Sequence, residues 1–328
     1  MILRRIVRTL KNRYFIGLHW GRYHKNVKVA DWVDFNMAGP GTVTFVTDTF
    51  FIPLCSRNFL PNIFTPERKV KRYWDILSVG RNIREKKFET LLREIRKIYD
   101  TGRRYNVLLV IPSSKLEDTD DAKFATGLID LYYDLFSDEE RQHVCLMKID
   151  WKVGMYGLPR LTLAWIYKNS KVFTLLTQEE GESRVIAEAL LARNTVVVKS
   201  DLRGGGLDYL SSSNSVTFDD YNDCYKTLIK AVEEYESRPE AEISDELLEE
   251  HSIKKLKGYF ATFYKEHGLP FDENLINTNN LDMRLASHYW DKNIAWGKPL
   301  SKKFLPNDLT TISSFFEFRN YLLKNQVS

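Results

Sequence analysis

Between residues 73 and 220, short apolar runs rich in β-branched side chains alternate with segments that have the 3.6-residue period of helices. Continuously apolar strands that alternate with helices are typical of a parallel sheet buried on both faces. The expected strands span 75–79, 105–111, 144–149, 171–176, 195–199 and 215–218. The expected helices span 88–98, 125–136, 161–167 and 185–190. The pattern predicts an α/β fold with a doubly wound parallel sheet, in which ligands bind beyond the carboxyl ends of the strands.

The two flanking parts of the chain have weaker patterns. Residues 1–72 hold a strand-like run at 42–46 and an irregular stretch at 53–66 whose prolines are typical of a linker. Residues 241–328 are expected to form a helical C-terminal tail with a polar and aromatic end. No internal repeat is recognisable in the sequence. We therefore predict a short N-terminal segment with a linker, a ligand-binding domain at 73–240, and a C-terminal extension.

The overall charge is nearly balanced, with 48 Lys and Arg residues, 44 Asp and Glu residues, and a formal net charge of +4. This balance does not call for nucleic acid as a partner, and none is expected. The three cysteines, Cys55, Cys145 and Cys224, lie far apart and lack the spacing of metal ligands. Reduced thiols and a cytoplasmic location are the simplest interpretation, and no metal site is expected.

The first residues have a pattern of their own. No apolar run reaches the roughly 18 residues that a membrane-spanning helix needs. At 2–11, however, apolar side chains gather on one side of a helical wheel and Arg and Lys on the other. Such a helix could lie on an anionic membrane surface as a peripheral contact, act as a targeting peptide, or pack on a domain.

The first motif whose residues could bind a ligand follows the predicted strand at 75–79. Gly80 permits a tight turn, and Arg81 on that turn would project above the strand end. Lys86 lies where the next helix opens and would project to the same side. Arginine offers forked hydrogen bonds and lysine a compact charge, so the pair suits a diphosphate. Solvated surface cations are the alternative interpretation.

The second motif begins with Glu180 and Gly181, directly after the strand at 171–176. Gly181 frees the backbone, and a helix is expected to begin near Glu182 or Ser183. The N–H groups in the first turn of a helix have no partner within the helix and form a ready anion site. Glu180 would lie beside whatever this turn binds. The alternative is that these acidic residues only favour the helix dipole.

Glu188 lies further along the same helix, between Ala187 and Ala189. The helix is otherwise apolar, so a surface position for this carboxylate is only the alternative interpretation. A partly buried carboxylate needs a partner, and vicinal hydroxyl groups could donate two hydrogen bonds to it.

A third motif, the glycine run at 204–206, would let the backbone approach a ligand or turn sharply into a short helix at 207–210. A flexible loop is the equal alternative there.

Together and in this order, the motifs resemble the donor domain of family 4 retaining glycosyltransferases, whose GT-B fold has two Rossmann-like halves. That family carries a Gly-Arg-x-x-x-x-Lys turn after its first strand, which Gly80, Arg81 and Lys86 match. It also carries a Glu-x7-Glu motif, which Glu180 and Glu188 match. The resemblance covers about half of the chain.

The resemblance implies transfer of a sugar from a nucleotide-sugar donor, with retention of anomeric configuration. Arg81 and Lys86 would bind the diphosphate and Glu180 would orient the sugar, and these three are the expected catalytic residues. Glu188 would hold the ribose hydroxyls. The expected donor-binding residues are Gly80, Gly181, Glu182, Ser183, Arg184, Glu188, Gly204 and Gly205. No metal or other cofactor is expected, because cationic side chains and the helix terminus would supply the electrostatic stabilisation. Base recognition is expected at 153–158.

The N-terminal region departs from the family pattern. Only about 72 residues precede the donor domain, and the family's N-terminal glycine loop and matching histidine are not recognisable, although His19 and His24 lie in this region. The acceptor site is therefore expected to be reduced, built from 241–328, supplied by a partner chain, or lost. The acceptor would be a saccharide, a lipid-linked sugar or a protein. The alternative to an active enzyme is a catalytically inactive, glycosyltransferase-like binding or scaffold subunit.

Overall fold

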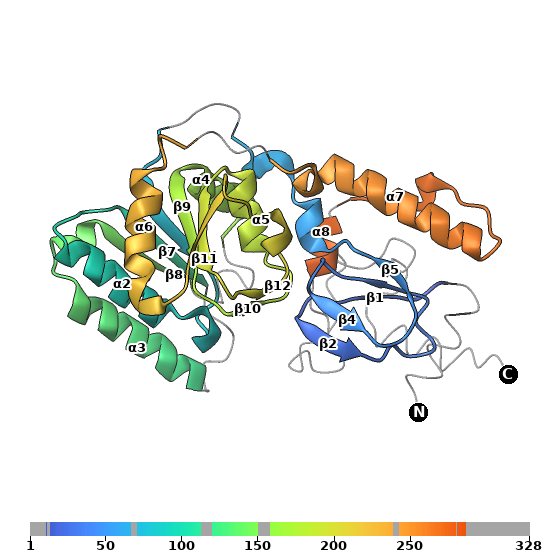
Figure 1. The fold of residues 1–328 in the computed structure, drawn as a ribbon, viewed down its shortest axis with the longest axis horizontal. Coiled ribbons are helices and arrows are strands. Elements are labelled where there is room, and N and C mark those ends of the chain that lie inside the picture. The colour runs from blue at the N-terminus through green and yellow to red at the C-terminus, as the bar shows by residue number, and fades with distance from the viewer. Residues whose placement is uncertain are drawn as a thin grey trace.

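A computed structural model of the chain shows two units side by side, an α/β unit and a smaller second unit (Figure 1). The basic segment at 2–11, most of the predicted base-recognition loop at 153–158 and the aromatic end of the tail lie outside the described residues. The structure describes residues 11, 14–66, 71–112, 120–149, 158–238, 243–279 and 281–286. Among these residues, no helix is both long and apolar enough to cross a bilayer.

Six parallel strands form the central sheet of the α/β unit, in the spatial order β13-β11-β9-β6-β7-β8. Their bounds are β6 Trp74–Val79, β7 Val107–Pro112, β8 Val144–Ile149, β9 Ser170–Leu175, β11 Thr195–Lys199 and β13 Ser215–Phe218. Numbered along the chain, the strands lie in the order 3-2-1-4-5-6, as in the doubly wound dinucleotide-binding fold. The predicted fold class is confirmed, and each predicted strand is present.

Helices cover both faces of this sheet (Figure 1). Successive side chains of a strand point to opposite faces, so Ile76 packs with one layer of helices and Leu77 with the other. Because both faces are buried, the strands are apolar throughout. The first layer contains α2 Phe88–Asp100, α3 Asp120–Leu135 and α6 Cys224–Glu233, and the second contains α4 Arg160–Lys168 and α5 Arg184–Leu191.

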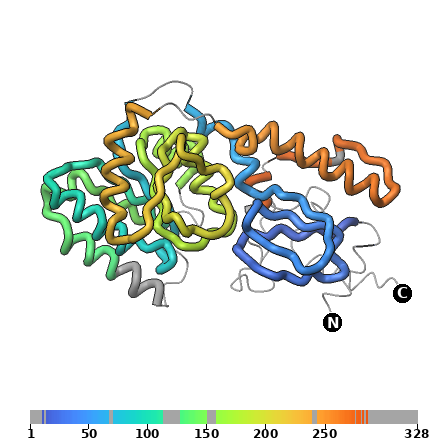
Figure 2. The backbone as a smooth tube through the Cα atoms, in the orientation of Figure 1, coloured from blue at the N-terminus to red at the C-terminus, as the bar shows by residue number. Residues whose placement is uncertain are grey.

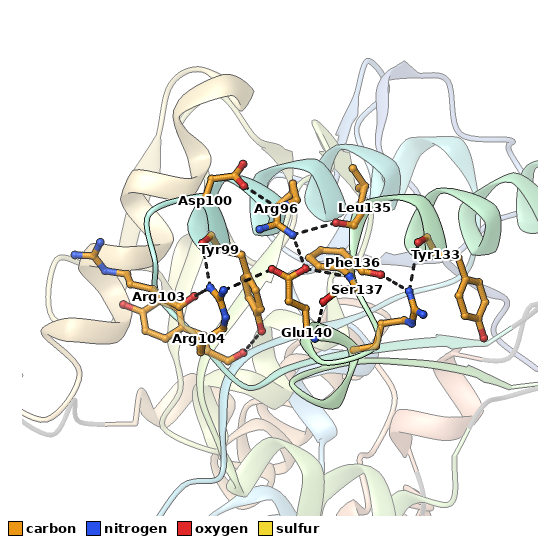
Figure 3. A network of polar contacts seen from close by, with 12 residues as sticks. Arg96, Tyr99, Asp100, Arg103, Arg104, Tyr133, Leu135, Phe136, Ser137 and Glu140 are labelled. Carbon is orange, nitrogen blue, oxygen red and sulfur yellow. Dashed lines mark hydrogen bonds and ion pairs between the residues drawn. The ribbon is translucent and has the colours of Figure 1, made fainter.

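A polar network ties α2 to the end of α3 (Figure 3). The Glu140 carboxylate accepts hydrogen bonds from Arg96 Nη1 at 2.7 Å and from the Ser137 backbone N–H at 3.0 Å. Arg96 also donates to the Leu135 carbonyl at 3.1 Å. The hydrogen bond from Arg96 lowers the pKa of Glu140 from 4.5 to about 2. This contact therefore stabilises the fold above the ordinary pKa of a glutamate and is lost as the pH falls toward 2.

The second unit begins with a short coil of parallel strands, which we call the N-terminal coil (residues 14–52). Strands β1, β3 and β5 pair in that order, and β2 pairs with β4. Each strand therefore pairs with a strand about one turn of the coil further along the chain. The bounds are β1 Gly17–His19, β2 His24–Val27, β3 Phe35–Met37, β4 Val43–Phe45 and β5 Phe50–Ile52.

The backbone of this coil repeats although the sequence has no recognisable repeat. Three hydrogen bonds from a backbone N–H to a side-chain oxygen hold successive turns together, and each joins residues 18 positions apart. They run from Ile16 to Asp34 at 2.7 Å, from Asn26 to Thr44 at 3.0 Å and from Val29 to Thr47 at 3.0 Å. Polar side chains rather than a repeated apolar pattern thus set the register.

Helices from the other end of the chain complete the core of the second unit. Figure 2 shows α7 in orange running along the blue N-terminal coil. Phe263 of α7 makes edge-to-face contacts with Phe15 at 4.8 Å and with Phe50 at 5.0 Å between ring centroids. The helices are α7 Glu249–Glu266 and α8 Leu281–Ala286. The buried residues of this core are Met37, Ile52, Leu54, Phe59, Leu256 and Leu281.

The proline-containing stretch at 53–66 is largely buried, most of all at 54–60, unlike the linker that its composition suggests. Its two short helices are η1 Ser56–Phe59 and η2 Asn62–Phe64. Leu60 and Phe64 are at most 1% exposed and belong to the core beside α4 and α5. η1 contacts α7, α8 and α5. The chain therefore passes through the junction of the two units and contributes side chains to both cores.

Candidate functional site

The candidate site lies where the chain changes direction within the sheet. From β6 the chain builds outward to β8, and β9 then returns to the other side of β6. In doubly wound sheets, such a reversal leaves a crevice outside the carboxyl ends of the two strands, and ligands bind there. The loops at 80–87 and 176–183 follow β6 and β9 directly. Both loops carry residues that the sequence motifs singled out.

Lys86 and Glu180 form an ion pair between these two loops, with side chains 15% and 11% exposed. Lys86 ends the short helix η3 Arg84–Lys86, and Glu180 lies in the short strand β10 Glu179–Glu180. The structure thus brings together two predicted catalytic residues from loops that are far apart in the sequence. Among the described residues Lys86 forms an ion pair with no other acid, so it can exchange the Glu180 carboxylate for a ligand phosphate.

The third predicted catalytic residue, Arg81, is exposed on the loop after Gly80. Asn82 beside it is 4% exposed, and its side-chain oxygen has no hydrogen-bond partner among the described residues. This loop therefore offers an accessible guanidinium next to a buried amide. Gly80 itself has room for a Cβ, because the nearest heavy atom would lie 3.5 Å away.

The glycine run brings a third loop against Glu180. Strand β12 Arg203–Gly204 pairs in parallel with β10, which places Gly204 beside Glu180. Gly204 has a φ of +103°, and a Cβ there would lie 1.7 Å from the Glu180 carbonyl oxygen. A Cβ on Gly205 would lie 2.1 Å from the Arg57 guanidinium. At both positions a side chain would clash with neighbouring protein atoms, which explains the two glycines without a ligand. Gly206 makes the turn into η5 Leu207–Tyr209.

The N-terminal coil closes over the loop after β9. The Thr42 hydroxyl donates to the Gly181 carbonyl at 3.2 Å. A Cβ on Gly181 would lie 2.1 Å from the Gly21 carbonyl oxygen. Gly181 is thus needed for a close approach of two backbones, and not only for the freedom of its own turn. The loop after β9 therefore contacts both units.

Glu182 is bound by the N-terminal coil and by η1. One carboxylate oxygen contacts His19 Nε2, and the other accepts a hydrogen bond from the Ser56 hydroxyl at 2.5 Å. The Glu182 side chain is 9% exposed and that of His19 is 17% exposed. Sequence reasoning missed both partners, because β1, which carries His19, is too short to have a detectable period, and Ser56 lies in the stretch whose prolines suggest a linker. Among the described residues, no group of three or more His, Cys, Asp or Glu side chains could hold a metal ion.

Helix α5 begins at Arg184, close to the predicted start. Ser183 is its N-cap residue, is 4% exposed, and makes no capping hydrogen bond through its side chain. Its hydroxyl group has no hydrogen-bond partner among the described residues. The first N–H groups of a helix also have no partner within the helix. This end of α5 therefore combines a buried free hydroxyl with outward-pointing N–H groups, which suits an anion.

Glu188 belongs to a buried cluster with Arg184 and Tyr167. It is 5% exposed, and one carboxylate oxygen lies 3.9 Å from Arg184 Nη2. Burial raises the pKa of Glu188, while the charge of Arg184, the Tyr167 hydroxyl and the charge of Arg160 oppose this rise. Positive charge from Arg184 thus lies beside the buried carboxylate, which otherwise lacks water.

Replacing Glu188 by glutamine is expected to stabilise the fold near neutral pH. Since burial raises the pKa of this carboxyl group, its ionisation becomes unfavourable to folding as the pH rises above its ordinary value of 4.5. Glutamine does not ionise, so the stability difference between Glu188→Gln and the natural chain should grow between about pH 5 and about pH 8. Urea unfolding at both pH values measures it. A loss of stability that is equal at both would contradict this account.

No protein-family model and no curated protein matches the chain, whereas solved structures do. The apo structure of OtsA matches with a TM-score of 0.54 and 13% identity, over 78% of this chain and 69% of that chain. The E. coli trehalose-6-phosphate structure bound with UDP-2-fluoro glucose matches with a TM-score of 0.52 and 12% identity, over 83% and 71%. An α,α-trehalose-phosphate synthase (UDP-forming) from Burkholderia vietnamiensis matches with a TM-score of 0.50 and 11% identity, over 80% and 69%.

At identities of 11 to 13%, these matches show the fold. The chain has a parallel-sheet α/β architecture that resembles the Rossmann-like domains of GT-B glycosyltransferases.

Proposed function

We propose that this chain is a retaining glycosyltransferase, similar to family 4, that moves a sugar from a nucleotide-sugar donor to an acceptor. The observation that carries the proposal is the Lys86–Glu180 ion pair beyond the carboxyl ends of β6 and β9, next to the start of α5. The GT-B fold of the chain supports it. So do the matched structures, one of which is UDP-forming and another bound with UDP-2-fluoro glucose.

The diphosphate of the donor would lie between two loops of the crevice. Lys86 would exchange Glu180 for phosphate oxygens, and the exposed Arg81 would fold over them. The free hydroxyl group of Ser183 and the first N–H groups of α5 would hydrogen-bond from the other side. These groups would stabilise the negative charge that develops on the diphosphate as the sugar leaves.

The transferred sugar would lie against the loop at 180–183. Glu180, released from Lys86, would accept hydrogen bonds from sugar hydroxyls and orient the ring. His19 and Ser56, which hold Glu182, would border the sugar from the second unit. Glu188 would hold the ribose hydroxyls at the far end of the donor, with Arg184 beside it.

The acceptor would bind on the side of the second unit. We propose that 1–72 is the acceptor-side segment, 73–240 the donor domain and 241–328 an extension that completes the acceptor side. The packing of α7 and α8 against the N-terminal coil supports this division. A saccharide, a lipid-linked sugar or a protein would fit such an arrangement. A cytoplasmic location, with membrane contact through 2–11, would suit the lipid-linked case.

Binding to a panel of nucleoside diphosphate sugars, followed by mass spectrometry for hydrolysis or transfer, tests the proposal. Lys86→Met should weaken binding of the best donor about tenfold, the effect of one charged hydrogen bond of about 1.4 kcal/mol. Lys171→Met is the matched control, because Lys171 pairs with Asp75 at 2.8 Å where the same two strands begin. Equal donor affinity in both variants would remove the assignment.

A binding or scaffold subunit without activity is the second candidate. Two observations favour it: Glu188 is 5% exposed, and Gly181 packs against the Gly21 backbone without space for a side chain. In a scaffold, ion pairs between motif side chains, such as Lys86 and Glu180, would be permanent and would not be exchanged for a ligand. That candidate predicts that no donor of the panel binds or turns over, whereas the enzyme predicts at least one that does both.

A further inference from the structure

Asp282 reaches from the second unit into the α/β unit. Its carboxylate accepts a hydrogen bond from Arg184 Nη2 at 3.1 Å and forms an ion pair with Arg160. The residue is 2% exposed. Arg160 is the first residue of α4 and Arg184 the first residue of α5. Two guanidinium groups, each carried by the first residue of a helix, therefore converge on a single carboxylate.

This cluster has more positive charge and more donors than Asp282 can satisfy. Glu188, 3.9 Å from Arg184, and Glu249, whose charge acts on Arg160, are acids beside the two arginines, and burial raises the pKa of both carboxyl groups. Burial and then the charge of Arg184 lower the pKa of Arg160. Arg160 Nε is buried and has no hydrogen-bond partner among the described residues. A ligand with more charge and more oxygen atoms than a carboxylate would fit better.

We propose that Arg160 and Arg184 form a phosphate-binding site, and that Asp282 occupies this site as an intramolecular competitor. A phosphate group carries up to two negative charges and offers three oxygens, so it can accept forked hydrogen bonds from both guanidinium groups. The N-termini of α4 and α5 favour the same charge. Binding of phosphate would displace the Asp282 carboxylate and shift α8 away from the α/β unit.

This inference deepens the proposed function and rests on it in one respect, the identity of the phosphate as part of the donor's diphosphate, which Arg160 and Arg184 would share with Lys86 and Ser183. Arg184 follows Ser183 at the start of α5, and Glu188 lies one helical turn further. A donor that reached Glu188 would therefore pass the two arginines. Leu281, next to Asp282, packs in the core of the second unit, so α8 links donor binding to the junction of the units.

Asp282→Asn tests the competition, with inorganic pyrophosphate as the probe in a calorimetric titration. If Asp282 leaves the site free only about one tenth of the time, pyrophosphate should bind the variant about tenfold more tightly than the natural chain. Adding Arg160→Met should abolish this gain. The matched control is Glu273→Gln, which removes an exposed acid of the same C-terminal segment, paired with Lys257 at 3.1 Å, and should change nothing.

Hydrogen exchange in the natural chain gives a second measurement that does not depend on the stability of a variant. Pyrophosphate should speed amide exchange at 281–286 relative to sodium chloride of equal ionic strength. Equal or weaker pyrophosphate binding by Asp282→Asn, or unchanged exchange at saturating pyrophosphate, would overturn the inference. Donor binding by the natural chain together with either result would leave the proposed function standing. A gain in pyrophosphate affinity without binding of any donor would support the site and refute the proposed function.

Discussion

Replacing Arg57 by methionine is expected to lower the free energy of unfolding by about 3 kcal/mol or more, since breaking a buried ion pair typically costs about 3–5 kcal/mol. Arg57 is 0% exposed and lies in η1, at the junction of the two units. Its guanidinium donates to both oxygens of Asp208, at 3.0 and 3.2 Å, and stacks over the Tyr209 ring at 5.0 Å. Methionine fills much of the volume but leaves Asp208 without its cation.

The expected loss of stability in Arg57→Met depends on how exposed the Asp208 carboxylate is. Asp208 is 28% exposed, so water can solvate part of the stranded carboxylate, and the loss should fall near the lower end of the range. Arg203→Met is the matched control, because Arg203 pairs with Glu179 at 3.2 Å with both side chains about half exposed. An exposed pair of this kind contributes about 0–1 kcal/mol. Urea unfolding of the two variants measures the difference, and similar losses would contradict a junction role for Arg57.

Gly204→Ala is expected to cost about 3 kcal/mol of stability, from backbone strain of about 1–3 kcal/mol and overpacking of about 1–3 kcal/mol. The φ of Gly204 is +103°, and a Cβ would lie 1.7 Å from the Glu180 carbonyl oxygen. Neither atom is the flexible end of a side chain, so the β10–β12 pairing has to separate. Because Glu180 lies in β10, the same change should also displace it from Lys86 and weaken donor binding.

The control for this glycine is Gly258 in α7. A Cβ on Gly258 would meet no heavy atom within 4 Å. Alanine in the interior of a helix is more stable than glycine by about 0.5–1 kcal/mol, so Gly258→Ala should stabilise the fold. Thermal unfolding of both variants, with donor titration of Gly204→Ala, provides the measurements. Loss of stability without loss of donor affinity would separate Gly204 from the site.

The sheet was predictable because strands that are buried on both faces consist of consecutive apolar residues. Val196, Val197 and Val198 are all 0% exposed, and such runs stand out between polar segments. The loops after the first and fourth strands were predictable for the same reason, since a strand that is placed correctly also places the residue that follows it. The meeting of Lys86 and Glu180 follows from that geometry once the strand order is known.

The N-terminal coil was not predictable by the same route. Its strands have three or four residues, fewer than an alternating pattern needs to be recognised. Its turns are joined by side chains such as Asp34 and Thr44, which are also common in loops. The prolines at 53–66 suggested a linker because proline marks irregular backbone, and irregular backbone can nevertheless be buried when its polar groups find partners.

The partners of the predicted site residues were the least predictable part. Glu188 was expected to need a partner, and sequence proximity could suggest Arg184 but not Tyr167. Asp282 lies in a segment without a clear period, far along the chain from the arginines that it binds. Contacts of this kind depend on how the two units pack against each other, and a local sequence pattern does not predict which of their surfaces touch.

The second unit draws its core from both ends of the chain, with Phe15 and Phe50 packed against Phe263. A protein leaves the ribosome from its N-terminus, so the aromatic side chains of the coil emerge long before the helix that covers them. The α/β unit can close its own core in the meantime. The N-terminal coil is therefore synthesised well before the helix that buries its aromatic side chains, and a nascent chain stalled before α7 would present uncovered phenylalanines to chaperones.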